Sequence, residues 1–249
     1  MFFTFLLQLT AKDRTRRTNR QLGGMLAFVA GAINAGGFLA VRRYTSHMTG
    51  IVSSMADDLV GGSVGLALAG LVSLAAFIGG AISTTLLISW ARRHALRSKY
   101  ALALLLEALL LFGLVGANLS SLASLLVPTA VLLLCFIMGL QNAIVTKISQ
   151  AEIRTTHMTG VSTDLGIELG RLIYWNHSEK ANGIQMVRAN TDKLLMLATL
   201  LGLFFSGGLV GAMAFRAMGF SATLPIAAVL IAIALPAVVL DLRSQVLPR

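Results

Sequence analysis

A polar phrase occurs twice in a chain that is otherwise dominated by apolar runs. It is Thr-Ser-His-Met-Thr-Gly from Thr45 to Gly50 and Thr-Thr-His-Met-Thr-Gly from Thr155 to Gly160. Its hydroxyl groups and imidazole rings can hydrogen-bond a solute, and an imidazole changes charge near neutral pH. Its glycine lets a backbone or a ligand approach closely. The phrase therefore indicates a binding site for a polar or anionic solute.

The segments that follow the two phrases have the periodicity of amphipathic helices. Apolar residues recur there at every fourth position, namely Ile51, Met55 and Leu59, then Val161, Leu165 and Leu169. The threonines of each phrase are favourable N-cap residues. We therefore expect a short re-entrant or broken helix after each phrase, whose N-terminus offers free N–H groups and a partial positive charge to a solute.

Two asparagines extend the candidate site. Asn34 lies in Gly31–Ala35 and Asn142 lies in Gly139–Ala143, each upstream of its copy of the phrase. Their amides can donate and accept hydrogen bonds in the same cavity. The predicted solute-binding residues are Asn34, Thr45, His47, Thr49, Gly50, Asn142, Thr155, His157, Thr159, Gly160 and Asp164.

A structural turn is the alternative interpretation of the phrase. The same residue types allow a chain to turn tightly at a membrane interface, and a duplicated protein would keep such a turn twice without any ligand. Polar residues inside a membrane are functional by default, which favours the solute site. Ile51 follows the first copy, whereas Thr163 and Asp164 lie close behind the second. The second copy is therefore the stronger candidate for the solute site.

The composition is that of an integral membrane protein. Of 249 residues, 56% are hydrophobic and 12% are charged, and the mean hydropathy is +0.81, whereas about 25% of residues are charged in soluble domains. The net charge of +10 comes from short basic blocks at the ends of apolar segments, which argues against nucleic acid as a partner. The single cysteine, Cys135, excludes an intramolecular disulfide and a thiolate metal cluster, and we expect no metal and no cofactor.

Six apolar stretches are long enough, at about 17 residues or more, to cross a bilayer. They are 22–41, 64–91, 101–118, 127–147, 193–215 and 222–240. The sequence thus predicts an all-α polytopic protein with six transmembrane helices. Basic residues are concentrated in loops of one side, which predicts that both termini are cytoplasmic. Arg42, Arg43 and Arg216 are the exceptions, because they fall outside.

Three features recur in the same order in the two halves of the chain. Gly31–Ala35 corresponds to Gly139–Ala143, the phrase follows, and Phe77–Gly80 corresponds to Phe205–Gly208, whose glycines permit close helix packing. Three spans per half make the second half an inverted copy of the first. The predicted organisation is one membrane domain made of a basic cytoplasmic segment (1–21), two three-helix repeats (22–126 and 127–240) and a cytoplasmic tail (241–249).

Other acidic residues receive separate interpretations. Glu107 lies deep within an apolar run, where a charge is costly, so it should face protein or water. We expect a packed structural carboxyl, with proton coupling as the alternative. Asp58 and Glu168 are interpreted as solvated faces, and Asp164, Glu168 and Arg171 have the spacing to pair along one helix.

The chain resembles the YoaK-like family of bacterial membrane proteins, a family of unknown function. The resemblance rests on Ser46–Gly50, on Gly139–Ala143, on Arg154–Gly160 and on Thr163–Gly166, and it covers about residues 22–240. It implies a small multi-spanning inner-membrane protein and says little about substrate. In the family pattern an Asn usually follows the first His-Met-Thr-Gly, whereas Ile51 stands here.

The leading functional hypothesis is a secondary transporter or permease for a small polar or anionic solute. A non-transporting scaffold that binds a protein partner through the loop around Tyr174 and Trp175 is the alternative, although these residues are also typical interfacial anchors. An intramembrane enzyme is the weakest hypothesis, because the chain has no His-Glu-x-x-His, Gly-x-Ser-x-Gly or phosphate-loop motif. The expected partner is the lipid bilayer, and a homo-oligomer is compatible with the sequence.

Overall fold

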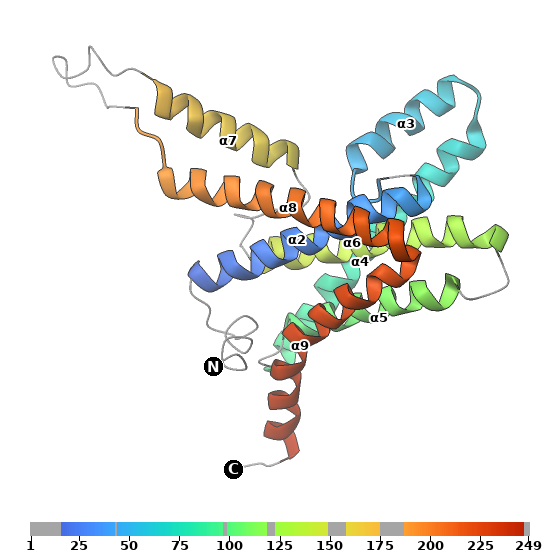
Figure 1. Ribbon diagram of the computed structural model, residues 1–249. Coiled ribbons are helices and arrows are strands. Elements are labelled where there is room, and N and C mark those ends of the chain that lie inside the picture. Colours follow the sequence, from blue (N-terminus) through green and yellow to red (C-terminus); the bar gives the residue numbers. More distant parts are fainter. Residues whose placement is uncertain are drawn as a thin grey trace.

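The computed structural model describes residues 16–42, 44–96, 99–118, 123–148, 158–174 and 187–246, and these residues form helices without strands (Figure 1). The helices are α2 (Arg16–Val41), α3 (Met48–Val60), α4 (Val64–Arg93), α5 (Ala101–Asn118), α6 (Ala123–Ile148), α7 (Met158–Ile173), α8 (Thr191–Met218), the 3-10 turn η2 (Gly219–Ala222) and α9 (Thr223–Val246). Each predicted span coincides with one long helix. The predicted short helices after the two phrases are α3 and α7.

The long helices have the length and hydropathy of membrane spans. Among the described residues, four apolar candidates are long enough, namely 18–41, 64–93, 127–147 and 191–243. The last candidate runs through α8, η2 and α9, and α5 is a shorter apolar helix. Large hydrophobic side chains of α4 and α8, such as Ile82 and Phe205, are exposed. Such a surface is stable in lipid and unfavourable in water, so the protein is membrane-embedded.

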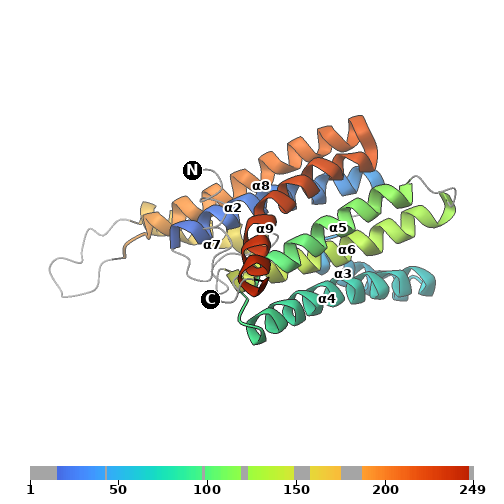
Figure 2. The same ribbon diagram turned by 90° about the horizontal axis from the view of Figure 1, so that it is seen from below.

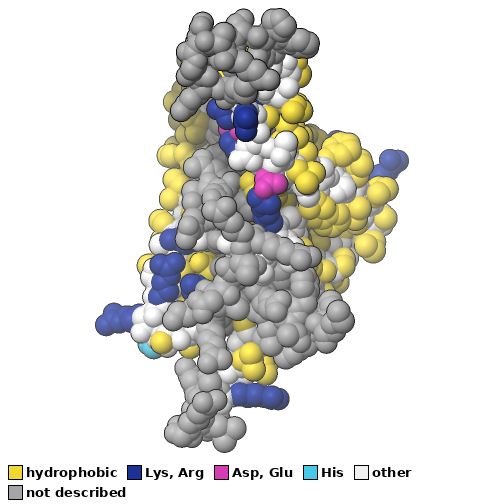
Figure 3. Space-filling model, turned by 90° about the vertical axis from the view of Figure 1, so that its left-hand side faces the viewer, with side chains coloured by type: hydrophobic (Ala, Val, Ile, Leu, Met, Phe, Trp, Pro, Cys, Tyr) yellow, Lys and Arg dark blue, Asp and Glu magenta, His cyan; other side chains and the backbone are white. Residues whose placement is uncertain are grey.

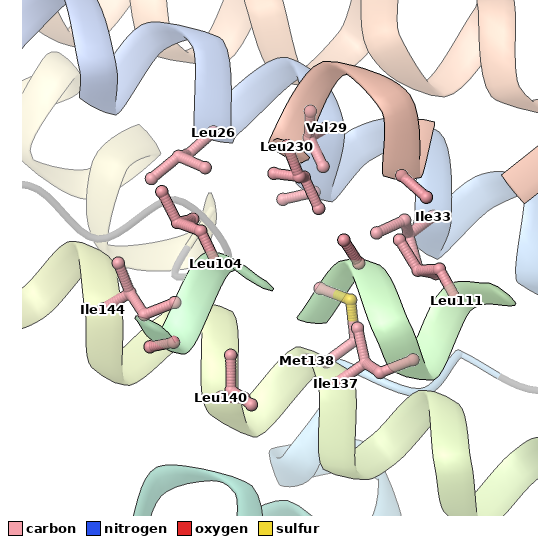
Figure 4. Close-up of a cluster of buried hydrophobic side chains, with 14 of the residues drawn as sticks. Leu26, Val29, Ile33, Leu104, Leu111, Ile137, Met138, Leu140, Ile144 and Leu230 are labelled. Atoms are coloured by element: carbon pink, nitrogen blue, oxygen red, sulfur yellow. The ribbon is translucent and has the colours of Figure 1, made fainter. Parts of the chain in front are cut away.

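The helices are arranged in two matching pairs around a central pair. Figure 2 shows α8 and α4 at opposite edges, with α2 beside α8 and α6 beside α4. Between these pairs, α5 packs against α9. Leu26 of α2, Leu104 of α5, Ile144 of α6 and Leu230 of α9 meet in the apolar core (Figure 4). The core therefore joins helices from both halves of the chain.

The two helix pairs cross at glycines. A Cβ atom on Gly31 of α2 would collide with the carbonyl oxygen of Phe204 in α8, and one on Gly207 would collide with the carbonyl oxygen of Phe28. The second crossing repeats this arrangement, because Gly139 of α6 lies on the carbonyl of Phe77 in α4. Gly80 of α4 in turn lies on the carbonyl of Phe136 in α6. The helices approach this closely because the glycines have no side chain.

These contacts correct the predicted alignment of the halves by one residue. Gly80 and Gly207 have the same role, and so do Phe77 and Phe204. The segment equivalent to Phe77–Gly80 is therefore Phe204–Gly207 and not Phe205–Gly208. Sequence similarity favoured the wrong register because two phenylalanines and two glycines are adjacent in α8, and only the contacts decide which of them lies in the crossing.

The two short helices fold back along the long helices that follow them. Ile51 and Met55 of α3 pack over Gly70 of α4, and α7 packs against α8. Figure 1 shows the N-terminal ends of α3 and α7 pointing toward the middle of the molecule from opposite sides. Since α3 has 13 residues and is about 20 Å long, it is too short to cross a bilayer.

Basic side chains gather at one end of the helices. The start of α2, the end of α4 and the end of α6 carry Arg20, Arg92 and Lys147. Figure 3 views this side of the molecule and shows Lys and Arg beside a broad hydrophobic flank. This segregation is the structural form of the charge bias that the sequence displays.

Candidate functional site

The first copy of the phrase lines a cavity of about 340 Å³. This volume falls at the lower end of the range for small-molecule sites. Four helices or helix ends contribute to it. From the end of α2 onward come Phe38, Arg42, Tyr44 and Thr45, from α3 and its start His47, Gly50, Ile51, Ser54 and Asp58, from α4 Leu66, Gly70 and Ser73, and from α6 Val131 and Cys135.

Arg42 enters this cavity through an unusual backbone conformation. Its φ is 57°, in the left-handed region that glycine usually occupies at the end of a helix, and its N–H donates to Phe38 O over 2.7 Å. A side chain in this region strains the backbone. The strained position ends α2 and directs the chain back toward the start of α3, with Arg42 among the residues that line the cavity.

Thr45 supplies a buried hydroxyl that has no partner. The residue is 1% exposed, and its Oγ1 makes no hydrogen bond among the described residues. The neighbouring Ser46 donates its hydroxyl to Asn34 Oδ1 over 2.8 Å, which fixes the phrase to α2. A buried hydroxyl without a partner costs about 1–3 kcal/mol, so the Thr45 hydroxyl is suited to a group that enters the cavity.

The N-terminus of α3 is uncapped at the cavity. The N-cap is His47, and no side chain caps the helix, whereas the sequence pattern predicts a threonine in this role. The first intrahelical bond runs from Ile51 N–H to His47 O over 3.1 Å. The His47 ring lies over Gly50, where an added Cβ would be 2.6 Å from Nδ1. The glycine therefore makes room for the imidazole. The free N–H groups in the first turn of α3 carry the positive end of the helix dipole.

The far end of the cavity is acidic. Asp58 lies in the last turn of α3 and lines the cavity with Leu66 of α4. Its residue is half-buried, and no hydrogen bond or ion pair of its carboxylate is found among the described residues. The N–H of Ser63, which begins α4, donates to the backbone O of Asp58 over 2.7 Å. Asp58 is thus a cavity residue and not only part of a solvated face.

The corresponding place in the second half is closed by ion pairs. Glu168 is 1% exposed, and its carboxylate accepts from Arg171 Nη1 over 3.0 Å and from Asn190 N over 2.9 Å. Lys193 Nζ lies 3.3 Å from Asp164 Oδ2 and 3.9 Å from Glu168 Oε1. The predicted pairing of Glu168 with Arg171 is confirmed, whereas the interpretation of Glu168 as a solvated residue is wrong. It is buried because α7 packs on α8 with Val161 and Glu168 inward.

The glycine crossings identify which residues correspond across the two hairpins. Gly80 and Gly207 are equivalent, which aligns Leu66 of α4 with Lys193 of α8 and Ser63 with Asn190. Ser63 and Asn190 are both N-caps, and their N–H groups contact residues 58 and 168 respectively. Lys193 therefore stands in α8 where Leu66 stands in α4.

The remaining predicted residues are distributed around these features. Thr155 and His157 lie outside the described residues. Thr159 and Gly160 are exposed in the first turn of α7, and Thr49 is exposed at the start of α3 without lining the cavity. Asn34 holds Ser46, and Asn142 lies half-buried in α6.

Arg42, Asp58 and Ser73 line the cavity but were absent from the predicted set. The sequence offers one signal for Arg42, because this arginine lies in a loop that is predicted to be outside, where basic residues are uncommon.

Glu107 is a carboxyl in the interior of the molecule. It is completely buried in α5, and neither of its carboxyl oxygens has a hydrogen-bond partner among the described residues. Gln141 of α6 is also completely buried. It donates to Leu26 O over 3.4 Å and leaves its own Oε1 without a partner. Both side chains lie among the apolar core residues of α2, α5, α6 and α9.

The fold and the hydropathy of its helices define a helical membrane protein. The family model described as "Protein of unknown function (DUF1275)" matches residues 22–236, so the chain belongs to this family, as do the YoaK-like proteins that its sequence resembles. Neither the comparison with curated proteins nor the comparison with solved structures gives a match.

Proposed function

We propose that the protein is a secondary transporter or permease of the inner membrane, and that the cavity beside α3 binds its small polar or anionic solute. The observation that carries the proposal is the buried Thr45 hydroxyl without a partner, at the wall of a 340 Å³ cavity. The guanidinium of Arg42 and the uncapped start of α3 add positive charge at this end. A turn that served only to connect two helices would not require an open cavity with such a lining.

The proposed organisation is six spans in two inverted repeats. It is supported by the matching glycine crossings and by the opposed directions of α3 and α7 (Figure 1). Helices that end inside a membrane protein expose N–H groups to a solute near the midplane, as in other transporters with repeats. Labelled cysteines at positions 50 and 160 should then react from opposite sides of the membrane, and reaction from the same side would contradict the inversion.

Uptake by proteoliposomes tests the solute site. Thr45→Val removes the hydroxyl and keeps the volume, and we expect it to lower the uptake rate of a transported solute by about tenfold. The matched control is Thr49→Val, because Thr49 is exposed and does not line the cavity. If small anions, amino acids and nucleobases neither bind to the reconstituted protein nor cross the membrane through it, the proposal is wrong.

Glu107 is the proposed proton-coupling residue. Its burial without partners requires a neutral carboxyl in this conformation, because a charge there would be costly. The nearby helices offer Gln141 and Thr223 as buried polar groups, and neither carries a charge. We expect Glu107→Gln to bind solute normally and to lose accumulation driven by a pH gradient. The control is Gln141→Leu, which keeps the carboxyl, and unchanged accumulation in Glu107→Gln would exclude this role.

A further inference from the structure

We infer that the cleft between α3 and α4 binds an extended zwitterion, with a primary ammonium group at Asp58 and an anionic group at the end formed by Arg42 and Thr45. This inference rests on the proposed solute site and names the chemistry of its ligand. It follows from three observations: a charge that is present in one hairpin and missing from the other, a buried hydroxyl, and the direction of α3.

The second hairpin shows what the acidic end of the cleft accommodates. Between α7 and α8, the ammonium of Lys193 lies against the carboxylates of Asp164 and Glu168. The equivalent of Lys193 in α4 is Leu66, which lines the cleft with Asp58. Among the described residues, the first hairpin therefore has the acid without a cation of the protein beside it, so that an ammonium group of a solute can occupy this place.

The opposite end of the cleft is suited to an anion. Arg42 supplies a guanidinium, and the uncapped start of α3 supplies N–H groups with partial positive charge. The hydroxyl of Thr45 is an independent indication, because it is buried at this end without a partner. A carboxylate here would accept hydrogen bonds from all three sources.

The length of the cleft limits the spacing of the two charges. Gly50 and Asp58 both line it and are separated by eight residues of α3, which corresponds to about 12 Å. Arg42 precedes α3 and Asp58 lies in its last turn, so the two charged lining residues stand at the two ends of this interval. The solute then carries its charges several bonds apart, and it lies with its anionic end at the positive end of the α3 dipole. An α-amino acid is too short to contact both ends.

Binding to the purified full-length protein tests this assignment. A series of ω-amino carboxylates from glycine to 6-aminohexanoate varies the spacing, and pentanoate and pentylamine each lack one charge. Calorimetry should give the highest affinity for members with three to five methylene groups. Pentanoate and pentylamine should bind about tenfold more weakly, because each leaves one end of the cleft without its partner.

Two substitutions with matched controls assign the ammonium to Asp58. Asp58→Asn should weaken 5-aminopentanoate by about tenfold and leave pentanoate unchanged. Asp57→Asn is its control, because Asp57 is exposed and outside the cleft. Leu66→Lys should place an ammonium at Asp58 as in α8 and exclude 5-aminopentanoate. Its control is Leu68→Lys, on an exposed residue of α4 that does not line the cleft.

The outcomes separate this inference from the proposed function. Pentanoate binding as tightly as 5-aminopentanoate, with no effect of Asp58→Asn, overturns the ammonium assignment and leaves a solute site for anions. Tight binding of glycine that depends on Asp58 overturns the extended length. Absence of binding by every compound to correctly folded protein overturns the inference, and the uptake measurements with small anions, amino acids and nucleobases then decide the solute site. Asp58→Asn removes no packing contact and carries the test if Leu66→Lys fails to fold.

Discussion

In the hairpin of α7 and α8, Glu168 is buried against Arg171, Lys193 and the N–H of Asn190. In the hairpin of α3 and α4, Asp58 occupies the corresponding place and lines an open cavity. No cation among the described residues pairs with it. Both hairpins begin with the same phrase and both fold back on a long helix that crosses its neighbour at glycines. The difference teaches that two hairpins of similar build can differ in how their acids are used: one acid is paired with the protein's own cations, and the other lines an open cavity.

The largest expected effect tests whether the two halves are built alike. Gly31→Ala and Gly139→Ala each force a methyl group into a backbone carbonyl of the facing helix, and each should lower the free energy of unfolding by at least about 2 kcal/mol. Unfolding in mixed micelles measures this. Gly113→Ala and Gly116→Ala are the controls, because a methyl group there meets nothing within 4 Å. A large effect in only one of the two crossings would break the structural equivalence.

An intermediate effect tests how the hairpins differ. Glu168→Gln leaves Arg171 without its carboxylate and leaves Lys193 with Asp164 alone, and it should lower the free energy of unfolding by about 1–2 kcal/mol, since both cations are partly exposed. Asp58→Asn should change it by less than about 0.5 kcal/mol, because that carboxylate has no partner to lose. Thermal unfolding of both variants measures the contrast. Equal losses would mean that Asp58 is held as firmly as Glu168.

The smallest expected effect sharpens the role of the open cleft. Arg42→Gly relieves a left-handed backbone conformation and should raise the free energy of unfolding by about 0.5–1 kcal/mol while it weakens solute binding. Ala95, just after the end of α4, has a similar φ of 54° and lies outside the cleft. Ala95→Gly should therefore raise the free energy of unfolding without weakening solute binding. Lower stability in Arg42→Gly would show that the guanidinium holds the structure and does not serve a ligand.

The helices and the two short segments could be predicted from the sequence, because their signals are local. The length of an apolar stretch defines a span, and apolar residues at every fourth position from Ile51 and from Val161 predict α3 and α7. The burial of the acids could not be predicted in this way. Glu168 is buried and its neighbour Leu169 is exposed, because Lys193 of α8 and the N–H of Asn190 bind the acid on the inner side of α7.

The site was predicted in part. Thr45, His47 and Gly50 line the cavity, whereas Thr49 does not, although all four belong to one phrase. Which of them face the cavity depends on the turn that Arg42 makes at the end of α2. A conformation that is rare for arginine leaves no recognisable pattern in a single sequence.

The sequence by itself determined that this is an all-helical membrane protein with a repeated polar phrase. In a bilayer each helix must satisfy its own backbone hydrogen bonds, so a span can be recognised from the length and hydropathy of its own residues. Only the tertiary structure decided the register of the two glycine crossings, the enclosure of Glu168 and the open cavity at Asp58. These features depend on contacts between residues more than 20 positions apart, such as Gly139 with Phe77 and Lys193 with Glu168, which no local pattern encodes.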